Sequence, residues 1–255
     1  MKWLHGLVVL TTLAALTTVA PAAHAVSPVP VTFGTSWDVP TNTLQMIVDA
    51  YLGTPGAIHV ETDFVGAHAG DLDPWFWVGS SFPTMMVTAV AGNAATNELG
   101  WYHETYVRPA LDGVNDGVIF TGAPSGGTIT VVTFPSGTSK FGFYLNTHKM
   151  VTTPTGPQQQ VFFTNRFLND IGPAGAGATH APFDGDVQAL VFDVSRWKGP
   201  GTWLVCFEDL DSGNPIESCC SGTDNDYNDL VFQVTANGAT PTKLMTFGGL
   251  KAIYR

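Results

Sequence analysis

Seven carboxylate side chains lie between Phe207 and Val234, in a segment that contains no lysine or arginine. Two carboxylates a few ångströms apart repel each other by about 1 kcal/mol in water and by about 4 kcal/mol at the effective dielectric of a protein surface. Several such pairs together rival the net stability of a whole domain. The side chains must therefore spread into solvent, hold protons or bind a cation.

The spacing of the oxygen-bearing residues favours a bound cation. Asp224, Asp226 and Asn228 occupy alternate positions in "DNDYND", and Asp229 follows directly. Oxygen atoms at every second residue converge on one point when the chain curls, as in the first half of an EF-hand loop. The segment is not an EF-hand, because Asp229 stands where that loop needs glycine and Thr235 where it needs glutamate.

The remaining ligands are expected from "FEDLD", at the end of the strand that precedes the acidic loop. Oxygen donors without Cys or His indicate Ca²⁺ before Zn²⁺ or copper. The alternative is a solvated acidic loop, which explains the charge but neither the alternation nor the immediate return of an apolar strand. The candidate metal ligands are Glu208, Asp209, Asp211, Asp224, Asp226, Asn228 and Asp229.

The first residues, 1–25, predict an exported protein. One early lysine precedes an apolar run from Leu7 to Ala20, and Ala23-His24-Ala25 follows, which is typical of a secretory signal peptide with an A-x-A cleavage site. The alternative is a membrane anchor, but the apolar run is short for one and Pro21 follows it. We expect the mature chain to start at Val26 and to be secreted, outside the cell or at its surface, with no contact to the membrane.

The charge of the chain excludes some partners. Without Lys2 the chain has 9 basic and 21 acidic residues, which is a net charge of about −12. Such a chain is a poor partner for nucleic acid or anionic lipid and suits cations. The charged fraction is only 12%, and glycine and proline are frequent, which favours an ordered β-rich protein over a disordered acidic one.

Three cysteines, Cys206, Cys219 and Cys220, lie in or beside the acidic segment. An exported protein meets an oxidising environment, so a disulfide is allowed. Because adjacent cysteines pair poorly with each other, we expect Cys206 to pair with Cys219 or Cys220 and the third thiol to be left over. Closing that loop would stabilise the fold by about 3 kcal/mol in the chain-entropy model.

The pattern of the chain predicts an all-β fold, an antiparallel and jelly-roll-like β-sandwich, with one short N-terminal helix. The helix is predicted near 42–52, where Thr41 or Thr43 can cap the start and Gly53 the end. Short segments rich in β-branched and aromatic residues predict the strands. These segments are 58–64, 83–90, 100–107, 127–134, 140–147, 159–165, 187–194, 201–210 and 228–236.

Two domain divisions are compatible with the length of the chain. One has an N-terminal β-rich part over 26–100 and a calcium-binding sandwich over 101–255. The other is one continuous domain over 26–255.

The stretch "WLVCFEDLDSG…GTDNDYNDLVFQV" resembles the signature of a bacterial secreted domain family of unknown function. That family occurs in RTX-type calcium-dependent adhesins and in exported proteins with a PEP-CTERM sorting tail. The likeness extends from about Trp101 to Ala236. It implies a β-sandwich that binds Ca²⁺ and acts in surface attachment or matrix, with no established catalysis. The matching positions are Phe207, Glu208, Asp209, Leu210, Asp224, Asp226, Tyr227, Asn228 and Asp229.

Two features depart from that pattern. The insert "NPIESCC" enlarges the acidic loop and adds cysteines. The final segment "TFGGLKAIYR" has no sorting or anchoring helix, which favours a released or self-assembling protein over an anchored one.

Two other groups of residues suggest weaker alternatives. Trp75 and Trp77 lie beside aspartates and could form a sugar-binding platform, although their alternation favours two core residues on one strand face. Glu208 with a nearby aspartate could form the carboxylate pair of a glycoside hydrolase, but a cation lowers the pKa of the carboxylates that hold it and makes them poor acids. His103-Glu104 lacks the second histidine of a zincin motif.

The sequence therefore predicts an exported, non-catalytic, calcium-binding β-sandwich that acts in extracellular adhesion, surface or matrix structure. The expected partners are other extracellular proteins, glycans or copies of the chain itself. A secreted carbohydrate-binding module is the main alternative, and a secreted glycoside hydrolase is the weaker one.

Overall fold

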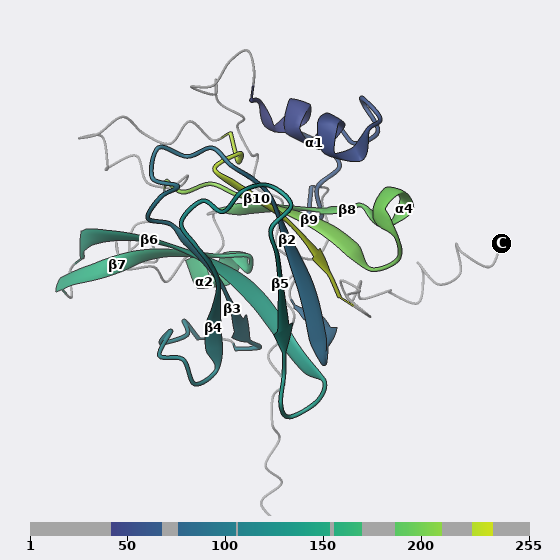
Figure 1. Cartoon of the computed structure of the whole chain (residues 1–255). Helices are drawn as coiled ribbons and strands as arrows, with labels where there is room; N and C mark the ends of the chain where they lie inside the picture. Colours follow the sequence, from purple (N-terminus) through teal and green to yellow (C-terminus); the bar gives the residue numbers. More distant parts are fainter. Residues whose placement is uncertain are drawn as a thin grey trace, which may run out of the picture.

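The computed structural model describes residues 42–67, 76–105, 107–153, 156–169, 187–210 and 226–236. The predicted signal peptide, the segment that follows it up to residue 41 and the residues after Ala236 lie outside these ranges. Within them the chain forms ten strands in two antiparallel sheets of five strands each (Figure 1). This arrangement confirms the predicted all-β sandwich.

The first sheet has the order β1-β6-β3-β4, and β7 also pairs with β6. The long strand β6 pairs with β1 at its beginning and with β7 in its second half, while β3 pairs with its middle. Its strands are β1 (Trp77–Gly79), β3 (Glu98–His103), β4 (Asp116–Thr121), β6 (Ser139–Thr153) and β7 (Gly156–Phe163).

The second sheet has the order β5-β2-β10-β9-β8. Its central strands come from distant parts of the sequence, because β10 lies between β2 and β9. Its strands are β2 (Ser81–Ala89), β5 (Ile129–Thr133), β8 (Ala189–Asp193), β9 (Thr202–Phe207) and β10 (Leu230–Thr235).

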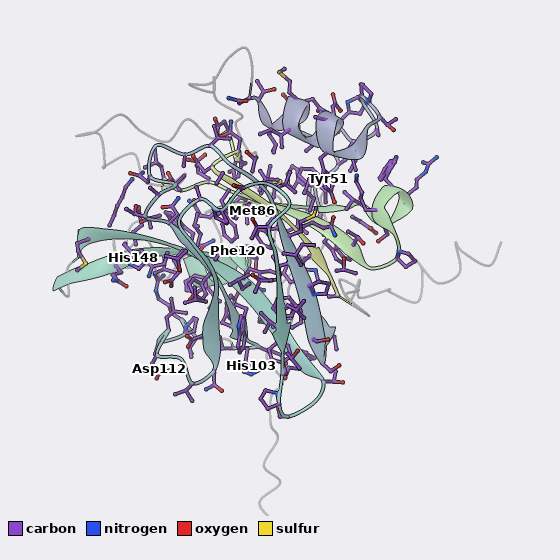
Figure 2. All side chains as sticks on the ribbon, viewed as in Figure 1. Tyr51, Met86, His103, Asp112, Phe120 and His148 are labelled. Atoms are coloured by element: carbon purple, nitrogen blue, oxygen red, sulfur yellow. The ribbon has the colours of Figure 1, made fainter. Side chains whose placement is uncertain are left out.

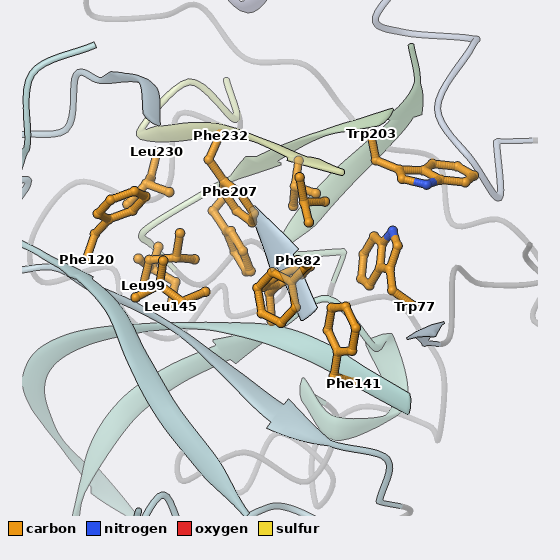
Figure 3. Packing of buried hydrophobic residues seen from close by; sticks show 14 of the residues in the cluster. Trp77, Phe82, Leu99, Phe120, Phe141, Leu145, Trp203, Phe207, Leu230 and Phe232 are labelled. Carbon is orange, nitrogen blue, oxygen red and sulfur yellow. The ribbon is translucent and has the colours of Figure 1, made fainter. Parts of the chain in front are cut away.

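Aromatic side chains from both sheets fill the space between them (Figure 3). Phe82 of the second sheet stacks on Phe141 of the first at a centroid distance of 4.3 Å. Trp77 is 3% exposed and lies against Phe143 and Trp203, with ring centroids 4.9 and 6.5 Å away. Trp77 is therefore a core residue and not part of an exposed sugar platform, and Trp75 lies outside the described residues.

Helix α1 (Leu44–Leu52) covers the outer face of the second sheet (Figure 1). The Thr43 hydroxyl accepts a hydrogen bond from the Met46 N–H, and Gly53 ends the helix in the left-handed conformation, as predicted. The apolar face of α1 packs against outward-facing side chains of β8, β9 and β10. This covering explains why Val231 is buried as fully as its neighbours on the other face of β10.

The predicted strand over 58–64 is wrong, because that segment forms turns. The Asp63 carboxylate accepts a hydrogen bond from the His59 N–H at 2.8 Å, and the His59 carbonyl accepts one from the Asp63 N–H at 2.9 Å. These local bonds replace the ladder bonds of a strand. The segment still buries Ile58, Val60 and Phe64 beneath α1.

The other predicted strands correspond to strands of the two sheets, but the sequence analysis missed β1 and β4. Two short helices, α2 (Arg166–Asn169) and α4 (Ser195–Lys198), connect strands of the sandwich. None of the helices within the described ranges has the length and apolar character needed to cross a membrane.

Residues from both sides of position 100 belong to the same sheets. Strand β3 itself runs across that position, and β1 and β2 pair with β6 and β10 from the later part of the chain. Strands from before and after position 100 are therefore hydrogen-bonded within the same two sheets.

Candidate metal centre

The acidic residues meet at one end of the second sheet. Strands β9 and β10 are antiparallel and Phe207 lies opposite Leu230, so the residues after Phe207 and those before Leu230 emerge together. Figure 3 shows Phe207 and Leu230 where they enter the core. The strand pairing therefore brings "FED" and "DYND" side by side, as the sequence analysis predicted.

Three carboxylates converge at this end of the sheet and are called the acidic cluster here: Glu208, Asp226 and Asp229. One oxygen atom from each lies within 4.8 Å of those of the other two. The residues are 0%, 6% and 8% exposed, respectively. Buried carboxylate oxygens in such proximity can together hold a metal ion.

The backbone around Tyr227 shapes the acidic cluster. Tyr227 has a φ of 54°, a left-handed conformation that is uncommon for a residue other than glycine. The N–H groups of Asp226 and Tyr227 both donate to Oε2 of Glu208, at 3.2 and 3.4 Å. The buried Tyr227 side chain fixes this turn, because its hydroxyl donates to the Val187 carbonyl at 2.7 Å.

Asp229 is held from two sides. Its carboxylate Oδ2 accepts a hydrogen bond from the Asp209 N–H at 2.7 Å, which links the ends of β9 and β10. Its backbone carbonyl accepts one from the Val90 N–H at 3.0 Å, directly after β2. The side chain of Asp229 is thereby oriented before any ion binds.

Asn97 is a neighbour of the acidic cluster that sequence analysis missed. It is fully buried, and its Nδ2 donates to Oδ2 of Asp209 at 2.9 Å. Its Oδ1 is a buried acceptor without a hydrogen-bond partner among the described residues. Asn97 lies 112 residues before Asp209, so no local pattern connects the two.

Burial and mutual repulsion favour the protonated form of Asp229 in the absence of a cation. Burial raises the pKa of Asp229 well above its usual value, and the charges of Glu208, Asp209 and Asp226 raise it further. The hydrogen bond from the Asp209 N–H lowers it by a smaller amount. Within the described part of the chain, no basic side chain forms an ion pair with Asp226 or Asp229.

The other predicted ligands take different positions. Asp209 lies beside the acidic cluster, with its carboxylate bound by Asn97. The Asn228 N–H donates to Oδ1 of Asp226 at 3.1 Å, while its side-chain amide donates to the Asn42 carbonyl at 2.8 Å. The remaining two, Asp211 and Asp224, lie outside the described residues.

The predicted disulfide from Cys206 is wrong, because Cys206 is a free cysteine. It lies in the middle of β9, opposite Leu190 and Val231, with a fully buried side chain in the apolar layer under α1. Burial raises the pKa of its thiol. The other two cysteines, Cys219 and Cys220, lie outside the described residues.

Comparison of the chain with the models of known protein families, with curated proteins and with solved structures found no match. The resemblance of the acidic segment to a secreted calcium-dependent family therefore stays a prediction.

Proposed function

We propose that this protein is an exported, non-catalytic β-sandwich that binds Ca²⁺ at the acidic cluster and acts in extracellular adhesion, surface or matrix structure. The observation that carries the proposal is the acidic cluster itself: three buried carboxylates whose oxygen atoms lie within 4.8 Å of one another. Buried charges of one sign need a counter-charge or a proton, and a divalent cation supplies the counter-charge.

The donor atoms favour calcium over other metals. The acidic cluster offers carboxylate oxygens, and the neighbouring side chains Asp209 and Asn97 also contain oxygen. Calcium accepts six to eight oxygen ligands in flexible geometry, whereas Mg²⁺ demands a regular octahedron and Zn²⁺ favours nitrogen and sulfur. The buried Oδ1 of Asn97 is an uncharged oxygen, a donor type that calcium also accepts.

A bound ion would act as a structural clamp. Its ligands come from the end of β9 and the turn before β10, and hydrogen bonds extend the contact to Val90 after β2 and Asn97 before β3. The ion would thus join the ends of β9 and β10 in the second sheet, and the hydrogen bond from Asn97 to Asp209 connects this end to the first sheet. Carboxylates held in this way are poor general acids, which supports a non-catalytic role.

The extracellular role rests on the predicted signal peptide and on the resemblance of the acidic segment. One feature of the fold is compatible with self-association: β5 is an edge strand on which Ile129 and Val131 are 62% and 61% exposed. Copies of the chain, other extracellular proteins and glycans remain the proposed partners.

Thermal unfolding tests the calcium proposal. The protein without residues 1–25 is melted in Ca²⁺, in Mg²⁺ and in EDTA, and native mass spectrometry counts the bound ions. We expect Ca²⁺ to raise the Tm above both other conditions, because an ion that binds only the folded state stabilises it by about 2.7 kcal/mol at a concentration of 100 Kd. Glu61→Gln, which removes an exposed carboxylate far from these strands in sequence, is the control and should respond like the wild type. Equal Tm values in Ca²⁺ and EDTA would contradict the proposal.

A further inference from the structure

A pocket of about 480 Å³ lies on the outer face of the first sheet, away from the interior core. It is formed by β3, β4, β6 and β7 together with the segment before β4. Its volume falls in the range of about 300 to 1,000 Å³ that is typical of small-molecule sites. The polar side chains that line it are Glu98, Arg108, Asp116, Tyr144, Asn146 and Gln159.

Tyr144 forms the floor of the pocket because its cross-strand partner is a glycine. Gly100 lies opposite Tyr144, and a Cβ atom at position 100 would lie 2.0 Å from Cζ of the tyrosine ring. The ring therefore lies flat across β3, and its hydroxyl donates to Oε1 of Glu98 at 3.3 Å. The second carboxylate oxygen of Glu98 lies 3.7 Å from Nε2 of His148.

Arg108 places a fixed positive charge beside the same pocket. Its Nη1 and Nη2 donate to the carbonyls of Leu168 and Val161 at 3.4 and 3.1 Å, and its guanidinium lies 5.0 Å from the centre of the Phe163 ring. Burial lowers the pKa of Arg108 to about 10, so the group keeps its charge at neutral pH. Two of its five N–H donors are used in these bonds.

Hydrogen bonds also fix the orientation of the other polar side chains that line the pocket. The Asp116 carboxylate accepts hydrogen bonds from the N–H groups of Asp112 and Gly113 at 3.1 and 3.0 Å. Asn146 donates to the Gln159 side chain at 3.3 Å. Figure 2 labels Asp112, before β4, and His148, on β6, which contact the pocket residues Asp116 and Glu98.

We infer that this pocket binds a neutral saccharide. Glu98 and Asp116 would repel an anion, while Arg108 would repel a cation. A hydroxyl group suits both kinds of side chain, because it donates to a carboxylate and accepts from a guanidinium or an amide. Val118 and Val161 supply apolar contacts for the C–H groups of a sugar ring.

The saccharide site does not include Trp77, which is buried in the core, and it does not rest on the calcium proposal. The two sites are nevertheless adjacent in the chain: Asn97 contacts Asp209 beside the acidic cluster, and the next residue, Glu98, lines the pocket. Saccharide binding must therefore be measured in both Ca²⁺ and EDTA, so that the two proposals can fail independently.

The test uses NMR titration of the protein without residues 1–25. The probes are glucose, galactose, mannose, N-acetylglucosamine and the disaccharides built from them, with glycine betaine as a zwitterionic comparison and acetate as an anionic one. We expect at least one saccharide to bind with a Kd of about 1 mM or tighter. The shifted amides should include Gly113 and Val118, which line the pocket.

Two pairs of variants locate the site. Val118→Trp fills the pocket from an exposed position (52%) on β4, and Val114→Trp adds the same group at an exposed position (74%) that does not line it. Glu98→Gln changes a pocket acceptor, and Glu104→Gln changes a carboxylate outside it. We expect each pocket variant to weaken binding at least about tenfold and each control to stay within about twofold.

If no probe saccharide shifts the pocket amides in either Ca²⁺ or EDTA, the pocket is not a saccharide site. Preferential binding of glycine betaine or acetate, or saccharide binding that survives Val118→Trp unchanged, would also refute it. Saccharide binding in EDTA by a protein that binds no Ca²⁺ would leave this inference standing and remove only the calcium proposal.

Discussion

Replacing Asp226 with asparagine should have opposite effects on stability with and without calcium. Asparagine keeps the shape of the side chain, and its Oδ1 can still accept the hydrogen bond from the Asn228 N–H that Asp226 accepts at 3.1 Å. The substitution therefore removes one negative charge from the acidic cluster and leaves the local turn in place. Its effect on the free energy of unfolding reports on the electrostatics of the cluster.

The size of the effect without calcium follows from the geometry. At the largest separation of 4.8 Å, two full charges repel each other by about 3.5 kcal/mol at an effective dielectric of about 20. Asp226 takes part in two such pairs, so two full-charge repulsions at this separation amount to about 7 kcal/mol, and shorter separations would give more. The raised pKa of Asp229 favours its protonated form, which reduces this repulsion. We expect Asp226→Asn in EDTA to be more stable than the wild type by about 1 to 3 kcal/mol.

In saturating Ca²⁺, Asp226→Asn should be less stable than the wild type. Asp226→Asn weakens the site by replacing a charged ligand with a neutral one, so saturating Ca²⁺ should stabilise the variant much less than the wild type. The assay is urea unfolding followed by tryptophan fluorescence, because Trp77 and Trp203 are buried in the core. Glu61→Gln, at an exposed position, should change neither curve. A variant that is less stable than the wild type in EDTA at neutral pH would refute the electrostatic reasoning.

In EDTA the free energy of unfolding should fall as the pH rises from about 4 through the raised pKa of Asp229, because the folded state binds the Asp229 proton more tightly than the unfolded state does. Urea titrations at several pH values measure this free energy. A free energy of unfolding that rises over this pH range would contradict the prediction. Gly100→Ala should destabilise the fold by about 1 to 3 kcal/mol in the same denaturation assay, since the new methyl group must displace the Tyr144 ring. Gly92→Ala is the matched control, because a methyl group at position 92 would meet open space. Cys206 should not react with a thiol reagent in the folded protein, because its side chain is buried and the pKa of its thiol is raised. Peptide mass spectrometry of native and unfolded samples measures the labelling, and labelled Cys206 in the native sample would contradict the prediction.

Local sequence patterns were sufficient for most of the secondary structure. The caps of α1 were predictable because Thr43 and Gly53 act on the backbone within a few residues of themselves. The strand over 58–64 was mistaken because Asp63 bonds to the backbone of its own turn, and β1 is too short for its pattern to stand out. The alternation of residues in "LVFQV" agrees with the structure, where Leu230, Phe232 and Val234 lie together in the interior core.

The candidate site was predictable only in part. Glu208, Asp226 and Asp229 could be proposed from the sequence because they directly flank two strands, and paired strand ends lie together. Asn97 could not be predicted from the ends of β9 and β10, because it lies in the connection between β2 and β3, which pairs with neither β9 nor β10. The disulfide prediction failed because spacing along the chain does not reveal that Cys206 points into the layer beneath α1.

The sequence by itself determined the strand-rich character of this protein, the capped helix and the accumulation of negative charge beside Phe207, because these depend on near neighbours in the chain. Only the tertiary structure decided which carboxylates lie together, that Trp77 is buried and where a polar pocket opens beside Tyr144. These properties depend on pairings between strands that are distant in sequence, such as β2 with β10 and β3 with β6. Local propensity does not specify such pairings, since they are selected by the burial of two whole sheet faces against each other.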